Sequence, residues 1–161
     1  MEWLGQKRIA WLEQALGRLD WVAEWRGRAE NLPAHLSVGL KGEDAAFFFL
    51  RRKGYTVVAR RWSSGDSPGD VDLIAWQDSL LCFIEVKTRT ARDMTPAETA
   101  VDWHKRQTLR RLARRYVRQL PQEIAPEVRF DVISVYLVPE QREQIEHFES
   151  AFGWNEGRGR E

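Results

Sequence analysis

The segment Leu80–Thr88 constrains the fold more than any other part of the sequence, because most of it is apolar on both faces of a strand. This pattern is typical of a central strand rather than a solvated edge. The preceding segment Val71–Trp76 also has the composition of a strand. A two-residue turn at Asp78-Ser79 would pair Gln77 with Leu80. The sequence therefore predicts a hairpin at the centre of a mixed α/β sheet.

Two acidic residues, Asp72 and Glu85, interrupt this apolar hairpin. Counting back from the turn places them directly opposite each other, where Cβ atoms are about 5 Å apart. Two carboxylates at that separation repel, unless one is protonated or a cation lies between them. Oxygen ligands suit hard divalent ions such as Mg²⁺ or Mn²⁺. The hairpin therefore predicts a metal site.

Lys87 lies two residues after Glu85, so both side chains point to the same face of the strand, while Val86 points to the other. An ammonium group beside the carboxylates could hold or deprotonate a water or stabilise charge on a phosphate oxygen, and a metal would lower the pKa of its bound water. This chemistry is metal-assisted phosphodiester hydrolysis. The alternative is a surface hairpin with ordinary ion pairs, which the apolar character of the strand disfavours.

A helix is predicted from Gly39 to a left-handed cap at Gly54. Its inward stripe follows the i, i+3, i+4, i+7 pattern and contains one carboxylate, Glu43. That side chain either caps a helix start or reaches the metal site, and its position alone does not decide between them.

A second helix is predicted from the capping box at residues 95–98 to about Leu120. Stepping by 100° per residue places Lys105 in the middle of its apolar stripe. A buried lysine needs an acidic or phosphate partner, so Lys105 is either an accessory site residue or a side chain that reaches outward to solvent. The other basic residues fall mostly on the opposite face, where they contact a phosphate backbone or remain solvated. Those proposed for nucleic-acid binding are Arg106, Arg110 and Arg114, together with Lys105.

Further strands are expected at Tyr55–Trp62 and Arg129–Val138, and residues 63–69 have the composition of a loop that leads to the site. Asp131 is expected to form a structural ion pair. Residues 1–36 hold half of the eight tryptophans among charged residues and predict amphipathic helices, which dock on the main domain or bind a partner or nucleic acid. The domain itself spans 37–152, followed by a disordered tail at 153–161.

Composition excludes several classes of protein. A single cysteine, Cys82, rules out a disulfide framework and Cys/His zinc spacing, and is expected in the core. No apolar run approaches a membrane span and the first ten residues lack a signal-type stretch, so we expect a cytoplasmic protein without membrane contact. The net charge of +1 hides two basic clusters that flank the proposed site in sequence, at residues 51–61 and 105–118.

In order along the chain, these residues resemble the PD-(D/E)xK nuclease superfamily, and more narrowly its YraN-like family of small bacterial proteins, which is related to archaeal Holliday-junction resolvases. The resemblance covers about Val38 to Phe152. The stretches that carry it are residues 39–46, 69–75, 83–89, 129–132 and 151–152.

The resemblance implies that Asp72 and Glu85 bind Mg²⁺ or Mn²⁺, that Lys87 orients water or phosphate, and that Glu43 is a further acidic member of the catalytic site. Lys105 would be a supporting basic residue. The chain departs from the pattern at Asp70, where the family usually has Glu. Asp70 shares a face with Asp72 and could assist it. The Trp-rich extension is not part of the usual family pattern.

Together, the residues and the resemblance predict a restriction-endonuclease-like α/β domain with a helical N-terminal extension. The expected activity is Mg²⁺-dependent endonucleolytic cleavage of DNA, with branched or recombination intermediates as candidate substrates. A homodimer would suit a branched junction, because two cuts need two sites. The alternatives are a nucleic-acid-binding protein that does not cut, or an interaction protein whose partner binds the N-terminal helices.

Overall fold

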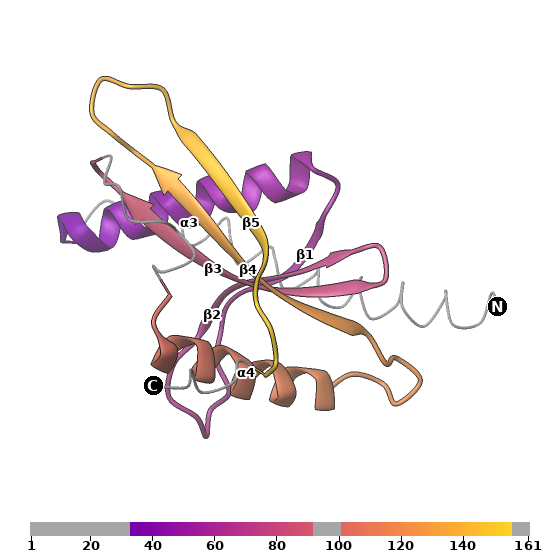
Figure 1. The fold of residues 1–161 in the computed structure, drawn as a ribbon. Coiled ribbons are helices and arrows are strands. Elements are labelled where there is room, and N and C mark those ends of the chain that lie inside the picture. Colours follow the sequence, from indigo (N-terminus) through magenta and orange to yellow (C-terminus); the bar gives the residue numbers. More distant parts are fainter. Residues whose placement is uncertain (1–32, 92–100, 156–161) are drawn as a thin grey trace.

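The computed structural model describes residues 33–91 and 101–155 of the chain. A five-stranded sheet in the order β1-β2-β3-β4-β5 forms its centre (Figure 1). All neighbouring strands are antiparallel except β3 and β4, which are parallel. The predicted mixed α/β sheet with a central third strand is therefore confirmed. The elements are α3 (Ala34–Arg52), β1 (Thr56–Trp62), β2 (Val71–Gln77), β3 (Leu80–Arg89), α4 (Trp103–Arg118), β4 (Glu127–Tyr136) and β5 (Gln144–Phe152).

The two helices lie on opposite sides of the sheet (Figure 1). The α3 side buries alternate residues of the central strands, such as Cys82 and Ile84, while the α4 side buries Leu81 and Phe83. This alternation is the period of two expected of a strand that is covered on both faces. Neither helix is long and apolar enough to cross a membrane.

The central hairpin has the predicted register. Gln77 pairs with Leu80, and the pairing continues to Leu73 opposite Ile84. The turn between the strands contains Asp78 in a left-handed conformation, with φ 51°. Aspartate tolerates this conformation better than most residues. Asp72 and Glu85 adjoin this last pair, one on each strand.

Both helices begin elsewhere than predicted. Helix α3 starts at Ala34 after Pro33, which extends it by five residues before Gly39. Helix α4 starts at Trp103, where the side chain of Asp102 accepts a hydrogen bond of 2.9 Å from the Lys105 amide. Asp102 has an extended backbone, so the prediction of one uninterrupted helix from residue 95 onward is wrong. The predicted capping box at 95–98 lies outside the described residues, as do the helices predicted in residues 1–32.

The C-terminal part of the domain also differs from expectation. Strand β5 has no counterpart among the predicted strands, although it pairs with β4 over most of its length. Beyond it, Trp154 packs edge-on against Phe130 with ring centroids 4.8 Å apart. The expectation of disorder from Gly153 onward is therefore wrong at Trp154, because the indole has an aromatic partner in the core. Residues 156–161 lie outside the described part.

Candidate functional site

The two hairpin carboxylates adjoin the last pair of the β2–β3 ladder, Asp72 on β2 and Glu85 on β3. Glu85 alternates with Leu81 and Phe83, so it lies on the side of the sheet that α4 covers. Asp72 Oδ2 accepts a hydrogen bond of 2.7 Å from the Val86 amide, which ties β2 to β3 beyond their last paired residues. The Glu85 side chain is 5% exposed. Val86 points to the other face, where it packs against the α3 side of the core. This is the arrangement that the alternation of the strand predicts.

Two lysines neutralise Glu85 from different elements. Lys87 Nζ lies 3.0 Å from Glu85 Oε1, and Lys105 Nζ lies 3.0 Å from Oε2. Lys105 also donates a hydrogen bond of 3.2 Å to the carbonyl of Asp70 and lies 3.7 Å from its Oδ1. Of the two alternatives for Lys105, the structure therefore places it inward at the carboxylates. Asp70 lies at the edge of the same group.

The electrostatics of the site oppose a second negative charge beside Glu85. Burial and the charge of Glu85 raise the pKa of Asp72 to about 8, although the Val86 amide and Lys105 counteract this and Glu43 adds to it. Burial lowers the pKa of Lys105, but the charges of Glu85 and Asp72 outweigh it, and the net pKa is raised. Lys105 therefore stays protonated while Asp72 holds a proton that an added cation would displace.

Glu43 lies in the interior of α3, not at its start, so it does not cap a helix. It is 7% exposed, and its two oxygens accept hydrogen bonds of 2.8 and 2.7 Å from the guanidinium of Arg61. Arg61, one residue before the end of β1, has a left-handed conformation, with φ 45°. Beside this pair, Arg60 binds Asp44 at 2.6 Å. Two ion pairs thus hold α3 on β1, and Glu43 influences Asp72 through its charge.

The loop between β1 and β2 is held against α4 by hydrogen bonds from basic residues. Arg111 donates to the carbonyl of Pro68 at 3.0 Å, and Arg115 donates to Ser64 Oγ at 2.8 Å. Gly69 has φ +92°, and a Cβ added there would lie 2.7 Å from Thr108 Cγ2. The loop therefore reaches Asp70 in a fixed path, which the sequence predicted only as a loop near the site. Composition gives no signal for these long-range contacts.

The basic residues proposed for nucleic-acid binding lie in different environments. Arg110 is 2% exposed and donates 2.8 Å to the carbonyl of Gly153, so its expected outward position is wrong. The physical reason is that β5 and the residues after it cover this side of α4. Arg106 donates to the carbonyl of Val101 at 2.8 Å and is partly buried. Arg114 is exposed.

Asp131 forms the structural ion pair expected of it. It is fully buried and binds the guanidinium of Arg129 through both oxygens at 2.8 Å. His147 Nε2 lies 2.9 Å from Oδ2, and the Ser150 amide donates 3.0 Å to Oδ1. Burial alone would raise the pKa of Asp131, but these hydrogen bonds outweigh it and lower the pKa. Cys82, also expected in the core, is fully buried.

The donor set at Asp72 and Glu85 fits a hard divalent cation. Within residues 33–91 and 101–155, no three His, Cys, Asp or Glu side chains converge as a ready-made metal cage. Mg²⁺ commonly binds through one or two carboxylates and completes its shell with water and substrate phosphate. Glu85 Oε2 is buried and lacks a well-formed hydrogen bond to the described residues, although Lys105 is close. An oxygen in this state is suited to a cation.

Comparison with known proteins matches this part of the chain to a family. The model of the uncharacterised protein family UPF0102 matches residues 42–135. A UPF0102 protein of Koribacter versatilis is 48% identical over 120 residues, which cover 74% of this chain and 82% of the relative. A UPF0102 protein of Flavobacterium psychrophilum is 36% identical over 119 residues, which cover 73% of this chain and 95% of the relative. The matched region contains the hairpin, Glu43 and Lys105.

Proposed function

Because this chain belongs to the UPF0102 family, also known as the YraN family, we propose that it is a metal-dependent endonuclease that hydrolyses phosphodiester bonds in DNA. The observation that carries the proposal is the opposed pair Asp72 and Glu85, with one lysine on each oxygen of Glu85. A purely structural ion pair would need one cation. The extra carboxylate and the raised pKa of Asp72 are costly features that a bound cation would relieve.

Asp72 and Glu85 would hold Mg²⁺ or Mn²⁺. When bound, such an ion supplies a Lewis acid for a phosphoryl oxygen and lowers the pKa of water. Lys87 is the more exposed of the two lysines, at 33% against 24% for Lys105. It is therefore the better placed to contact a phosphate oxygen or hold a water. Lys105 forms an ion pair with Glu85 and fixes it relative to the loop at Asp70.

The restriction-endonuclease-like fold is part of the same proposal. Its support is the resemblance of the motifs together with a mixed sheet that presents acid, acid and lysine at the end of a hairpin. DNA, and branched DNA in particular, follows from the resemblance to junction resolvases. A homodimer would provide the two sites that paired cuts require.

The decisive experiment measures cleavage of a four-way DNA junction and a linear duplex with Mg²⁺ or Mn²⁺. Glu85→Gln and Lys87→Ala should each reduce the cleavage rate at least about 100-fold, as expected when a charged group at the reacting centre is removed. Glu143→Gln and Lys41→Ala are matched controls, since both side chains are exposed and away from the hairpin. If Glu85→Gln or Lys87→Ala cuts as fast as the parent, the proposal is overturned.

A second candidate is a nucleic-acid-binding protein without catalysis. It is favoured by one observation, which is that both oxygens of Glu85 already have an ammonium partner. Binding that needs no divalent ion and weakens steeply with salt, in a protein that never cuts, would support it. The third alternative, a partner for the N-terminal helices, concerns residues outside the described part and stays a prediction.

A further inference from the structure

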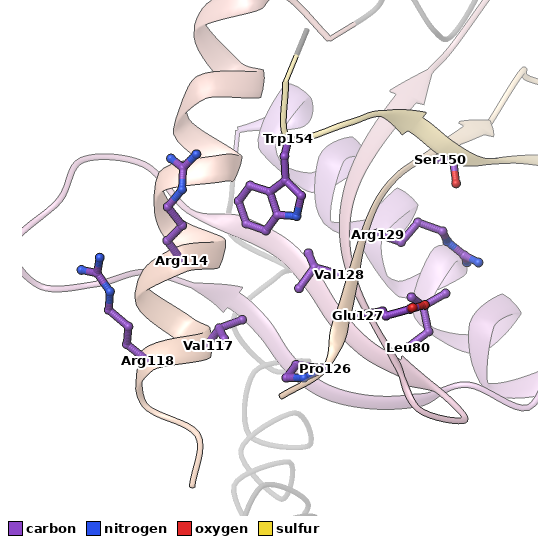
Figure 2. Close-up of a pocket in the computed structure, with 10 residues that line it drawn as sticks. All are labelled: Leu80, Arg114, Val117, Arg118, Pro126, Glu127, Val128, Arg129, Ser150 and Trp154. Carbon is purple, nitrogen blue, oxygen red and sulfur yellow. The ribbon is translucent and has the colours of Figure 1, made fainter. Parts of the chain in front are cut away.

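A pocket of about 880 Å³ lies at the start of β3 (Figure 2). It is formed by the start of β3 and β4 and by the C-terminal half of α4. Leu80, where β3 begins, is five residues from Glu85, which is about 17 Å along a strand. The pocket is therefore a separate site. Its lining includes Arg114, Arg118, Val117, Val128, Glu127 and Trp154.

Two guanidinium groups stand at this pocket without an acidic partner. Arg114 and Arg118 lie four residues apart on α4, so they share a face of the helix, and both are exposed. Neither forms an ion pair with any residue of the described ranges. In contrast, Arg129 is committed to Asp131 and Tyr55. The pocket therefore offers two guanidinium groups that have no carboxylate partner in the described ranges, against one exposed acid, Glu127.

The aromatic wall of the pocket is held in place by the core. Trp154 packs edge-on against Phe130, which stacks on Phe152 with centroids 5.0 Å apart. Arg110 anchors the backbone just before Trp154 through the carbonyl of Gly153. The indole is thus positioned before any ligand arrives, which lowers the entropic cost of binding. Arg114 lies 5.1 Å from its ring centroid, and Figure 2 shows the two side chains beside each other.

We propose that this pocket binds an unpaired nucleotide segment of a nucleic acid, with a base stacked on Trp154 and flanking phosphates bound by Arg114 and Arg118. A rigid aromatic face beside unpaired cations is the combination by which proteins bind single strands. Val117 and Val128 pack on the same side of the sheet as Trp154, and their apolar surface suits the face of a base. The choice of nucleic acid as ligand rests on the proposed function. The inference extends it by naming the substrate class, which is DNA that exposes unpaired bases.

Binding of the full-length protein to fluorescently labelled oligo(dT) and to a duplex of equal length, followed by anisotropy in EDTA, tests the inference. The parent should bind the single strand more tightly. Trp154→Leu should weaken that binding about fivefold or more, while Trp154→Phe should retain most of it. Thermal unfolding of both variants checks that the packing on Phe130 survives, and Trp154→Phe keeps the test valid if Trp154→Leu unfolds.

The arginines are tested by salt dependence. Arg114→Ala/Arg118→Ala should reduce the slope of log K against log salt by about 1.4, at about 0.7 for each phosphate contact with a single strand. Arg51→Ala/Arg142→Ala is the matched control, because both side chains are exposed and lie outside the pocket lining. This control should leave the slope unchanged.

Several outcomes overturn the inference. Equal affinity for single strand and duplex would overturn it, as would a folded Trp154→Leu protein that binds the single strand like the parent. An equal decrease of the salt slope in the Arg51→Ala/Arg142→Ala control would also overturn it. No binding of nucleic acid at all would overturn it and would point to a protein ligand. Failure of the proposed function is distinguishable. If the protein binds oligo(dT) through the pocket but never cuts DNA, the inference about the pocket holds and the proposed nuclease activity is wrong. If it cuts DNA but binds single strand and duplex equally well, the nuclease proposal holds and the inference about the pocket is wrong.

Discussion

Gly42 of α3 lies against Thr88 of β3 so closely that there is no space for a side chain between them. A Cβ added at Gly42 would lie 2.8 Å from Thr88 Cβ and closer still to its Oγ1. This contact brings the helix that carries Glu43 onto the strand that carries Glu85 and Lys87.

Gly42→Ala should destabilise the protein by about 1–3 kcal/mol, because the added methyl group must push α3 away from β3. Gly39→Ala is the matched control, since that glycine lies in the same helix with nothing within 4 Å of an added Cβ. It should stabilise by about 0.4–1 kcal/mol through the better helix propensity of alanine. Urea unfolding measures both, and equal changes in the two variants would contradict the close packing.

The raised pKa of Asp72 makes the metal-free protein less stable as the pH increases. Since the folded state holds this proton up to about pH 8 while the unfolded chain releases it near pH 4, the stabilisation is present below pH 4 and is lost as the pH rises through 8. The slope from this group is at most about 1.4 kcal/mol per pH unit. Asp72→Asn should therefore flatten the fall in urea midpoint between pH 5 and pH 8 in EDTA. Asp66→Asn is the control, because the Asp66 side chain is 93% exposed, and its urea midpoint should fall with pH as that of the parent does.

Mg²⁺ should stabilise the parent and not Asp72→Asn. A ligand at ten times its Kd adds about 1.4 kcal/mol to the free energy of unfolding. Because binding displaces the proton of Asp72, the stabilisation at a fixed Mg²⁺ concentration should be larger at pH 8 than at pH 5. Thermal unfolding with and without Mg²⁺ measures this. An equal increase in the two proteins would place the ion elsewhere.

Asp131→Asn should destabilise the fold without altering the chemistry of the site. Removing this charge takes away the two carboxylate hydrogen bonds of Arg129 and leaves Glu149, 3.6 Å away, as its acidic partner, at a cost of about 3 kcal/mol. Because the pKa of Asp131 is lowered in the folded state, its contribution is present above pH 4 and is lost as the pH falls through that lowered pKa. The variant should thus lose less stability on acidification than the parent. Cleavage per folded molecule should stay within about twofold, and a larger loss would assign Asp131 a catalytic role.

The hairpin was predictable because its signals are local. A strand repeats every two residues, so the turn at Asp78 determines which residue of the second strand pairs with each residue of the first, and it predicts Glu85 as the partner of Asp72. The helical repeat likewise locates Lys105 on the apolar stripe, but it left open whether the side chain reaches the site or solvent. Periodicity therefore predicts the strand and helix positions of these residues, and the contacts of Lys105 decide between its two alternatives.

Other features depend on contacts between distant segments. Strand β5 contains two glutamates, which hide its alternation, and it is stabilised by pairing with β4. Arg110 was expected outside because nothing near it in sequence indicates that Phe152 and Gly153 would cover it. The start of α4 was misplaced because the capping box at 95–98 matched the sequence rule better than Asp102, whose cap depends on the chain's path into the helix.

The parallel pairing of β3 and β4 has a consequence for how the site is assembled during folding. Strands β1 to β3 are neighbours in sequence and form by short hairpins, whereas β4 joins only after the chain has crossed over through α4. The two carboxylates therefore meet early, and Lys105 reaches Glu85 only when the crossover docks. Until then Lys87 is the one ammonium of the hairpin beside the two acids, so the reactive end is completed by a contact from outside the hairpin.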